Sequence, residues 1–267
     1  MDNRPIGVFD SGLGGLTVVK ELLKELPDEN IVYFGDTARI PYGNRSREIV
    51  TRYSAQCIRF LLSKDIKMVV IACNTASSSS VETLTTRFDI PILGVIRPGA
   101  KAAVDATRSG RIGVIGTSGT IHSKAYPNAI REINPDILVI DEACSLFVPI
   151  VEEGWSNTEV AHLTAERYLD NLKKQEVDTV VLGCTHYPLL EQTISKVMGP
   201  GVKLINPAVG TARQTREVLK KRNLLREPGS EPVVSFYVSD FGQSFQRIGS
   251  HFLNREIAAD CIDIEKY

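Results

Sequence analysis

The sequence lacks an excess of charge of either sign and any long apolar run. Lys and Arg number 31 against 32 Asp and Glu in 267 residues, so the net charge of -1 does not predict a nucleic-acid partner. The longest apolar runs, such as 68–73 and 146–151, are far shorter than the ~20 residues that cross a bilayer. No apolar leader precedes the first predicted strand. We therefore expect no membrane association and a cytoplasmic protein.

The sequence also lacks a cysteine framework. It has five cysteines, at wide and irregular spacings and without a CxxC pair: Cys57, Cys73, Cys144, Cys184 and Cys261. Such an odd, scattered set does not predict structural disulfides. The one close Cys/His pair, Cys184 and His186, has no neighbouring ligands for a structural zinc ion, so we predict no metal site.

What is present is a regular alternation of short β-branched runs with amphipathic stretches. This alternation predicts an α/β fold in which crossover helices connect the strands of a parallel sheet. In the first part of the chain we expect strands at 5–9, 31–34 and 67–72 and helices at about 16–26 and 47–62.

Two pairs of segments repeat in the same order. Residues 68–76 read MVVIACNTA and residues 179–187 read TVVLGCTHY, while IGVFDSGLGG at 6–15 matches IGVIGTSGTI at 112–121. The offsets of the two pairs are nearly equal, which indicates an internal duplication. We predict two similar parallel-sheet α/β lobes related by a pseudo-twofold axis, with the active site in the cleft between them.

The boundaries of these lobes follow Pro-rich junctions near 91–98 and 205–207. We assign residues 98–207 to the second lobe. The local sequence does not decide where the segment after Pro207 packs, with its expected helix at about 211–222 and strand at 233–238. We assign about 208–267 to the first lobe, together with 1–97.

Cys73 and Cys184 occupy matched positions of the repeat, each at the end of a buried strand. Ligands of parallel sheets lie beyond the carboxyl ends of strands, where helix N-termini offer free N–H groups. The pKa of a thiol at such a place is expected to lie below the value of about 8.5 for a free cysteine. A single cysteine at such a place is often only a small buried hydrophobe. Two at equivalent positions favour a functional interpretation.

Two thiols that face one cleft from opposite lobes suit one kind of reaction. Removing a proton from one face of a carbon and returning one to the other face inverts a stereocentre. Asp10 and His186 lie in the loops beside the two cysteines, where they would tune the protonation of these thiols. The alternative interpretation is that Asp10 braces the Gly-rich turn and His186 caps a helix.

The Gly-rich turn after the first strand does not predict a dinucleotide site. Gly12 and Gly14 would need a third Gly or Ala at position 17, which is Thr17, and no P-loop motif is present. The 41–43 loop, with sequence PYG, is suited to bringing backbone N–H groups close to a ligand. Thr117 and Thr120 in the matching turn of the second repeat either supply hydroxyls to a ligand or cap a helix.

Taken together, five motifs resemble the glutamate racemases of the cofactor-independent aspartate/glutamate racemase family: DSGLGG at 10–15, PYG at 41–43, CNTAS at 73–77, GTSGTI at 116–121 and GCTHYP at 183–188. They occur in the family's order and span most of the chain. The resemblance implies two similar α/β lobes that interconvert L- and D-glutamate without a cofactor and supply D-glutamate for peptidoglycan. It also implies a homodimer.

The resemblance further implies roles for individual residues. Cys73 and Cys184 match the two catalytic cysteines, the first of which handles D-glutamate and the second L-glutamate. Asp10, Glu152 and His186 match charged groups that assist the thiols. The substrate-contacting positions of the family match Asp10, Ser11, Tyr42, Gly43, Asn74, Thr75, Thr185 and His186, to which we add Thr117 and Thr120. Ser145 departs from the family, which often has Pro there.

Three other functions compete with this interpretation. A racemase for aspartate or another amino acid would share the two cysteines and the duplication, and substrate length would separate it. A two-lobed protein that binds a small anion without chemistry would keep its affinity after both cysteines are changed to alanine. A thiol-redox protein would lose free thiols on mild oxidation.

Overall fold

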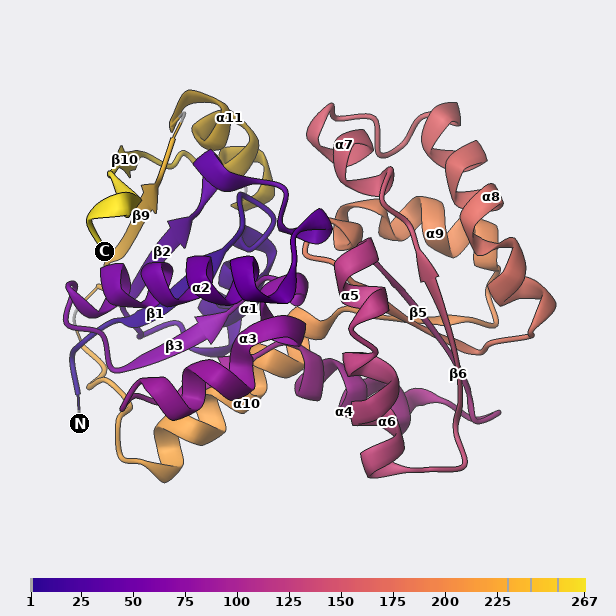
Figure 1. Ribbon diagram of the computed structural model, residues 1–267, viewed down its shortest axis with the longest axis horizontal. Helices are drawn as coiled ribbons and strands as arrows, with labels where there is room; N and C mark the ends of the chain where they lie inside the picture. Colours follow the sequence, from indigo (N-terminus) through magenta and orange to yellow (C-terminus); the bar gives the residue numbers. More distant parts are fainter. Residues whose placement is uncertain (1, 230, 241, 254) are drawn as a thin grey trace.

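Two parallel β-sheets, each with helices packed on it, lie side by side in the molecule (Figure 1). The computed structural model describes residues 2–229, 231–240, 242–253 and 255–267. Every strand pair in both sheets is parallel. The predicted fold class, α/β with two parallel-sheet lobes, is confirmed.

The first sheet has the strand order β10-β9-β2-β1-β3-β4. Its strands are β1 (Ile6–Asp10), β2 (Ile31–Gly35), β3 (Met68–Ile71), β4 (Ile92–Gly94), β9 (Val234–Val238) and β10 (Ala259–Cys261). The helices around it are α1 (Leu16–Glu25), α2 (Arg47–Leu62), α3 (Asn74–Arg87) and α11 (Gly242–Leu253), with short 3-10 turns at Thr37–Arg39, Tyr42–Asn44 and Ile264–Lys266.

The second sheet has the order β6-β5-β7-β8. Its strands are β5 (Arg111–Gly116), β6 (Leu138–Ala143), β7 (Thr179–Gly183) and β8 (Lys203–Ile205). Its helices are α4 (Ile96–Ala106), α5 (Ser118–His122), α6 (Ala125–Ile133), α7 (Phe147–Glu152), α8 (Glu159–Lys174) and α9 (Glu191–Met198), with a 3-10 turn at Tyr187–Leu190; α10 (Pro207–Lys221) follows β8.

The strand orders reproduce the sequence repeat. Four strands of the first sheet, β2-β1-β3-β4, correspond in order to the whole second sheet, β6-β5-β7-β8. The two repeated segments therefore form equivalent pairs, because β1 pairs with β3 as β5 pairs with β7. β1, β2, β3 and β7 are buried along their whole length, as expected of parallel strands covered on both faces.

Element ends shift slightly from the predicted ones. The first strand runs from Ile6 to Asp10, because the polar Asp10 continues the ladder opposite Gly35. The helix expected at 211–222 begins earlier, at Pro207, because the Asn206 side chain caps it by accepting from the Ala208 N–H at 3.0 Å.

Helix α10 connects the two halves of the molecule. It packs against α1 on one side and against α4 on the other (Figure 1). Downstream of it, β9 pairs with β2 and adds the C-terminal segment to the first sheet. The proposed lobe boundaries, 1–97 with about 208–267 and 98–207, stay a prediction.

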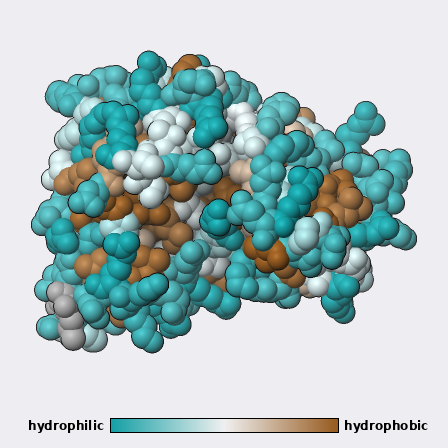
Figure 2. All heavy atoms as spheres, turned by 60° about the horizontal axis from the view of Figure 1, so that its bottom comes forward, coloured by the Kyte–Doolittle hydropathy of each residue, from teal (hydrophilic) through white to brown (hydrophobic). Residues whose placement is uncertain are grey.

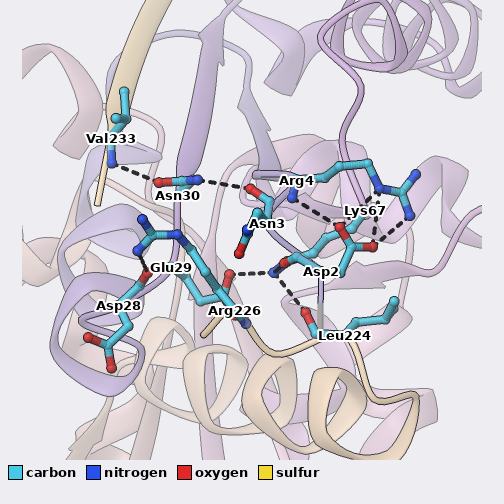
Figure 3. Close-up of polar contacts among 10 residues, drawn as sticks. All are labelled: Asp2, Asn3, Arg4, Asp28, Glu29, Asn30, Lys67, Leu224, Arg226 and Val233. Atoms are coloured by element: carbon cyan, nitrogen blue, oxygen red, sulfur yellow. Dashed lines mark hydrogen bonds and ion pairs between the residues drawn. The ribbon is translucent and has the colours of Figure 1, made fainter. Parts of the chain in front are cut away.

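A buried ion pair ties the chain together at the amino ends of the first sheet (Figure 3). Lys67 and Glu29 are almost fully buried, with Nζ and Oε2 2.5 Å apart. Lys67 also donates to the carbonyls of Asp2 and Leu224, and Glu29 accepts from the Arg226 N–H. Both charges are thus partnered, which a buried pair requires. The segment after α10 is held at the end of the sheet opposite to the loops described below.

The surface is mixed in character. On the face shown in Figure 2, hydrophobic residues form several patches separated by hydrophilic ones. Within the described ranges, no helix combines the length and the apolarity that a membrane crossing needs.

Candidate active site

A cavity of about 280 Å³ lies where loops at the carboxyl ends of both sheets meet. Its lining comes from the ends of strands and the residues that follow them in both sheets, from the loop before α2, and from α7 with the residue Ser145 before it: Ser11, Gly12, Ile40, Pro41, Tyr42, Gly43, Asn44, Cys73, Asn74, Thr75, Thr117, Ser145, Val148, Pro149, Glu152, Gly183, Cys184, Thr185 and His186. The duplication therefore brings the ends of equivalent strands β3 and β7, and with them both cysteines, to one cavity.

Cys73 is the N-cap residue of α3. Its Sγ accepts from the Ala76 N–H at 3.4 Å, and its S–H group donates to the Ser11 hydroxyl at 3.6 Å. The expectation of an acidic thiol is wrong here. Burial and the nearby Asp10 charge raise the pKa of Cys73 to about 12, and they outweigh the Ala76 and Ser11 hydrogen bonds. Cys73 is accordingly a protonated thiol at neutral pH.

Cys184, directly after β7, has a cationic neighbour instead. Its Sγ lies 3.9 Å from Nδ1 of His186, whose Nε2 lies 3.1 Å from Oε1 of Glu152. Burial by itself would lower the pKa of His186, but the bonds to Cys184 and Glu152 outweigh it and raise the pKa to about 10. A protonated ring donates from both nitrogens, one toward the thiol sulfur and the other to the carboxylate.

Asp10 lies behind the cavity wall rather than on it. Its side chain is fully buried and accepts from the Gly12 N–H at 3.0 Å and from the Thr185 hydroxyl at 3.4 Å. Burial raises the pKa of Asp10, although the His186 charge and these hydrogen bonds oppose the shift. The carboxyl group therefore does two things: it braces the Gly-rich turn and it connects β1 to the loop after Cys184.

The 41–43 loop is held by a buried tyrosine. The Tyr42 hydroxyl donates to Asp36, which also accepts from Arg39 at 2.7 Å. A Cβ on Gly43 would lie 2.9 Å from Cβ of Thr117. The loop therefore approaches the second sheet so closely that any residue other than glycine at position 43 would clash with Thr117. Both Tyr42 and Gly43 line the cavity, as the motif predicts.

Three threonine hydroxyls meet across the two halves of the site. The Thr75 hydroxyl lies 2.9 Å from that of Thr117 and 3.3 Å from that of Thr120. Thr117 is also the N-cap of α5, where it accepts from the Thr120 N–H. For Thr117 the two alternatives of the sequence, helix cap and cavity hydroxyl, both hold. Thr120 is buried behind it.

Most residues singled out in the sequence line this cavity, and Asp10 and Thr120 support its wall from behind. The lining also includes residues that sequence reasoning missed: Ile40, Asn44, Val148, Pro149 and Gly183. Val148 and Pro149 had only the apolar run 146–151 as a signal, which is too general to indicate a ligand contact, whereas Ile40 and Asn44 flank the PYG motif and Gly183 opens the GCTHYP motif.

The site offers thiols, hydroxyls, an amide and backbone N–H groups, together with the paired His186 imidazole and Glu152 carboxylate. All five cysteines fall within the described residues and are free. Among those residues there is also no group of three His, Cys, Asp or Glu side chains arranged to hold a metal ion. The hydroxyl, amide and N–H donors suit a small anion.

A model of the Asp/Glu/hydantoin racemase family matches residues 6–215. The chain belongs to this family. Members with curated names are similar over almost the whole length: the glutamate racemase of Geobacter metallireducens is 53% identical over 254 residues, which are 95% of this chain and 94% of that protein. The glutamate racemase of Neisseria meningitidis serogroup A is 48% identical over 253 residues, or 94% and 93%.

Solved structures of the family agree with the fold. The glutamate racemase of Francisella tularensis, determined in complex with D-glutamate, is 39% identical, covers 100% of both chains and superposes with a TM-score of 0.93. A glutamate racemase isoform of Bacillus anthracis is also 39% identical, over 98% of both chains, with a TM-score of 0.95. An aspartate racemase of Picrophilus torridus, 19% identical with a TM-score of 0.57, shares the fold alone.

Proposed function

We propose that this protein interconverts L- and D-glutamate by a two-base reaction. The observation that carries the proposal is the placement of Cys73 and Cys184 at equivalent strand ends of the duplicated fold, on one cavity. High identity to curated glutamate racemases supports glutamate as the substrate. We further propose that the reaction supplies D-glutamate for peptidoglycan, needs no cofactor or metal, and takes place in a cytoplasmic homodimer.

The reaction requires the two thiols to be in opposite protonation states. For this direction of the reaction we assign the thiolate to Cys184, whose sulfur lies 3.9 Å from Nδ1 of the protonated His186. The Cys184 thiolate would accept the α-proton of L-glutamate and become a thiol. The Cys73 thiol would then donate its proton to the opposite face of the planar carbanion, which gives D-glutamate and leaves Cys73 as the thiolate.

The carbanion must be stabilised, since an amino-acid α-proton is far less acidic than a thiol. Donors around the cavity would take up the charge that develops on the substrate carboxylate. The candidates are the side chains of Ser11, Thr75, Thr117 and Thr185 and the backbone of Tyr42 and Gly43, whereas the Asn74 amide would bind a substrate carboxylate in the ground and transition states alike. Glu152 would keep His186 protonated, and the buried Asp10 would hold the Thr185 loop in place.

The decisive experiment incubates the purified protein with L-glutamate in D₂O, with a chelator and without added cofactor. Optical rotation and the α-proton signal are followed together. Loss of both supports the proposal. Loss of both with L-aspartate alone would replace glutamate by the shorter substrate, and no change with either amino acid would leave the protein as a binding protein and overturn the proposal.

A further inference from the structure

One hydrogen bond crosses from the second sheet's helices to the residue beside Cys73. Tyr126, in α6, donates its hydroxyl to Oδ1 of Asn74 at 2.7 Å. Asn74 is the first residue of α3 and lines the cavity, whereas Tyr126 is 1% exposed and does not reach the lining. No motif in the sequence singled out this tyrosine.

The chemistry of the amide gives this bond a direction. An asparagine side chain has one carbonyl acceptor and an NH₂ group with two donors. Because Tyr126 donates to Oδ1, the NH₂ group is left for other partners. Within the described part of the chain, no protein atom accepts a hydrogen bond from Nδ2 of Asn74. The donors of this residue are therefore available to a ligand in the cavity.

We propose that Tyr126 is a positioning residue, which holds the Asn74 amide with its NH₂ group toward the cavity so that it donates to a substrate carboxylate. This inference rests on the proposed function. With the amide turned by 180°, Oδ1 would face the carboxylate and repel it. The tyrosine hydroxyl, the amide and the anion would form a series of two hydrogen bonds, in which each hydrogen bond polarises and strengthens the other.

Tyr126 is built for this task in two respects. Its ring fits between two glycines, since a Cβ on Gly99 or Gly183 would lie 3.1 or 3.2 Å from ring carbons. The ring therefore has little room to move. Burial, together with the charge of Cys184, raises the pKa of Tyr126 far above its ordinary value, so the hydroxyl remains a donor throughout the working pH range.

The test is a double-mutant cycle of Tyr126→Phe and Asn74→Ala, with glutamate racemisation measured as KM and kcat separately. We expect Tyr126→Phe to raise KM about tenfold, which corresponds to the loss of one good hydrogen bond. kcat should change by less than about twofold, because the contact is made in ground and transition states alike. In the Asn74→Ala background, Tyr126→Phe should have no further effect on KM.

Tyr187→Phe is the matched control for lost packing. Tyr187 is equally buried, and its hydroxyl donates to the carbonyl of Cys144 at 2.8 Å. Both Tyr→Phe variants should lower the melting temperature, but Tyr187→Phe should show no coupling with Asn74→Ala. An unchanged KM in Tyr126→Phe, a loss confined to kcat, or equal losses in both Asn74 backgrounds would overturn the inference.

Asn74→Asp tests the same contact if Tyr126→Phe does not fold. An aspartate still accepts from the Tyr126 hydroxyl, but it has no N–H group for the substrate. KM should rise at least as much as in Tyr126→Phe, and an unchanged KM would overturn the inference. These results are read against the wild-type protein: if it racemises neither glutamate nor aspartate in D₂O, the proposed function fails instead.

Discussion

The two halves of the site are alike in backbone and opposite in charge. Both cysteines follow equivalent strands, since β3 lies beside β1 as β7 lies beside β5. Yet Cys73 is paired with a neutral hydroxyl and lies near the carboxyl of Asp10, whereas Cys184 has a protonated imidazole beside it. Duplication supplied the geometry, and divergence of the loops placed neighbours of opposite charge, Asp10 and His186, beside the two thiols.

Each half also depends on the other for support. Asn74, after Cys73, is held by Tyr126 from the second lobe, and Thr185, after Cys184, is held by Thr17 from the first. A Cβ on Gly14 would collide with the Thr185 and His186 side chains, so the Gly-rich turn before α1 lies directly against this loop. The packing of the two lobes thus sets the positions of Asn74 and Thr185, the residues that follow the two thiols. Substitutions in either lobe can therefore test the difference between the Cys73 side and the Cys184 side.

The largest expected effect comes from removing either thiol. Cys73→Ser and Cys184→Ser should each lower kcat/KM for glutamate by about 10²–10⁴, the range of general acid–base catalysis. Cys261→Ser is the matched control, because this cysteine is exposed and should leave the rate unchanged. Near-normal turnover in either pocket variant, measured by circular dichroism, would sink the two-base assignment.

The next effect concerns the cation on the Cys184 side. His186→Asn removes the charge and should lower kcat/KM by about 10–100-fold, up to the lower end of the range of acid–base contributions, because the thiol itself remains. The loss must be the same in both directions, because the enantiomers are equally stable. A Glu152→Gln variant should show a smaller loss of the same kind. If His186→Asn were as active as the wild type at neutral pH, the charge would have no role.

The same histidine makes stability depend on pH. Its pKa is raised from about 6.5 in the unfolded chain to about 10 in the folded one. The folded state therefore binds a proton that the unfolded state releases, and the stabilisation is complete below about pH 6.5 and lost as pH rises through about 10. In urea unfolding, the free-energy difference between wild type and His186→Asn should shrink over this window. A difference that grows with pH would contradict it.

On the Cys73 side, the Asp10 charge is the feature to remove. Asp10→Asn should lower the pKa of the Cys73 thiol, because one of the two causes of its elevation disappears while burial remains. The measurement is the rate of alkylation by iodoacetamide as a function of pH, in a background with Cys184→Ser and Cys261→Ser. The midpoint of this curve is the pH at which half of the Cys73 thiol is deprotonated. A midpoint at the same or higher pH than in the Asp10 parent would refute this account.

The smallest expected effect comes from the cross-lobe hydroxyl of Thr17. It donates to the carbonyls of Gly14 at 2.8 Å and Thr185 at 3.0 Å. Thr17→Val should lower kcat/KM about 2–10-fold, in line with one hydrogen bond of about 0.5–1.5 kcal/mol. Thr17→Ser keeps the hydroxyl and should restore the rate. Equal rates for the valine and serine variants would show that the hydroxyl does not matter.

The sequence alone determined the fold class, the duplication and the two cysteines. Buried parallel strands carry a near-continuous apolar pattern, and equivalent strands of a repeat keep their spacing. The two IGV segments and the two segments that end in cysteine, VVIAC and VVLGC, can therefore be recognised from the sequence. The five motifs added the family and most of the cavity lining, because these residues cluster in short segments.

Tertiary structure decided what depends on contacts distant in the chain. The pairing of β9 with β2 placed the C-terminal segment, and no local pattern records it. Burial and Asp10 reversed the expected acidity of Cys73, although its helix N-terminus was correctly read. Tyr126 gained its role from a partner 52 residues away in sequence. Desolvation and cross-lobe hydrogen bonds arise only when the two halves pack together, which is why the sequence located the thiols but not the raised pKa of Cys73.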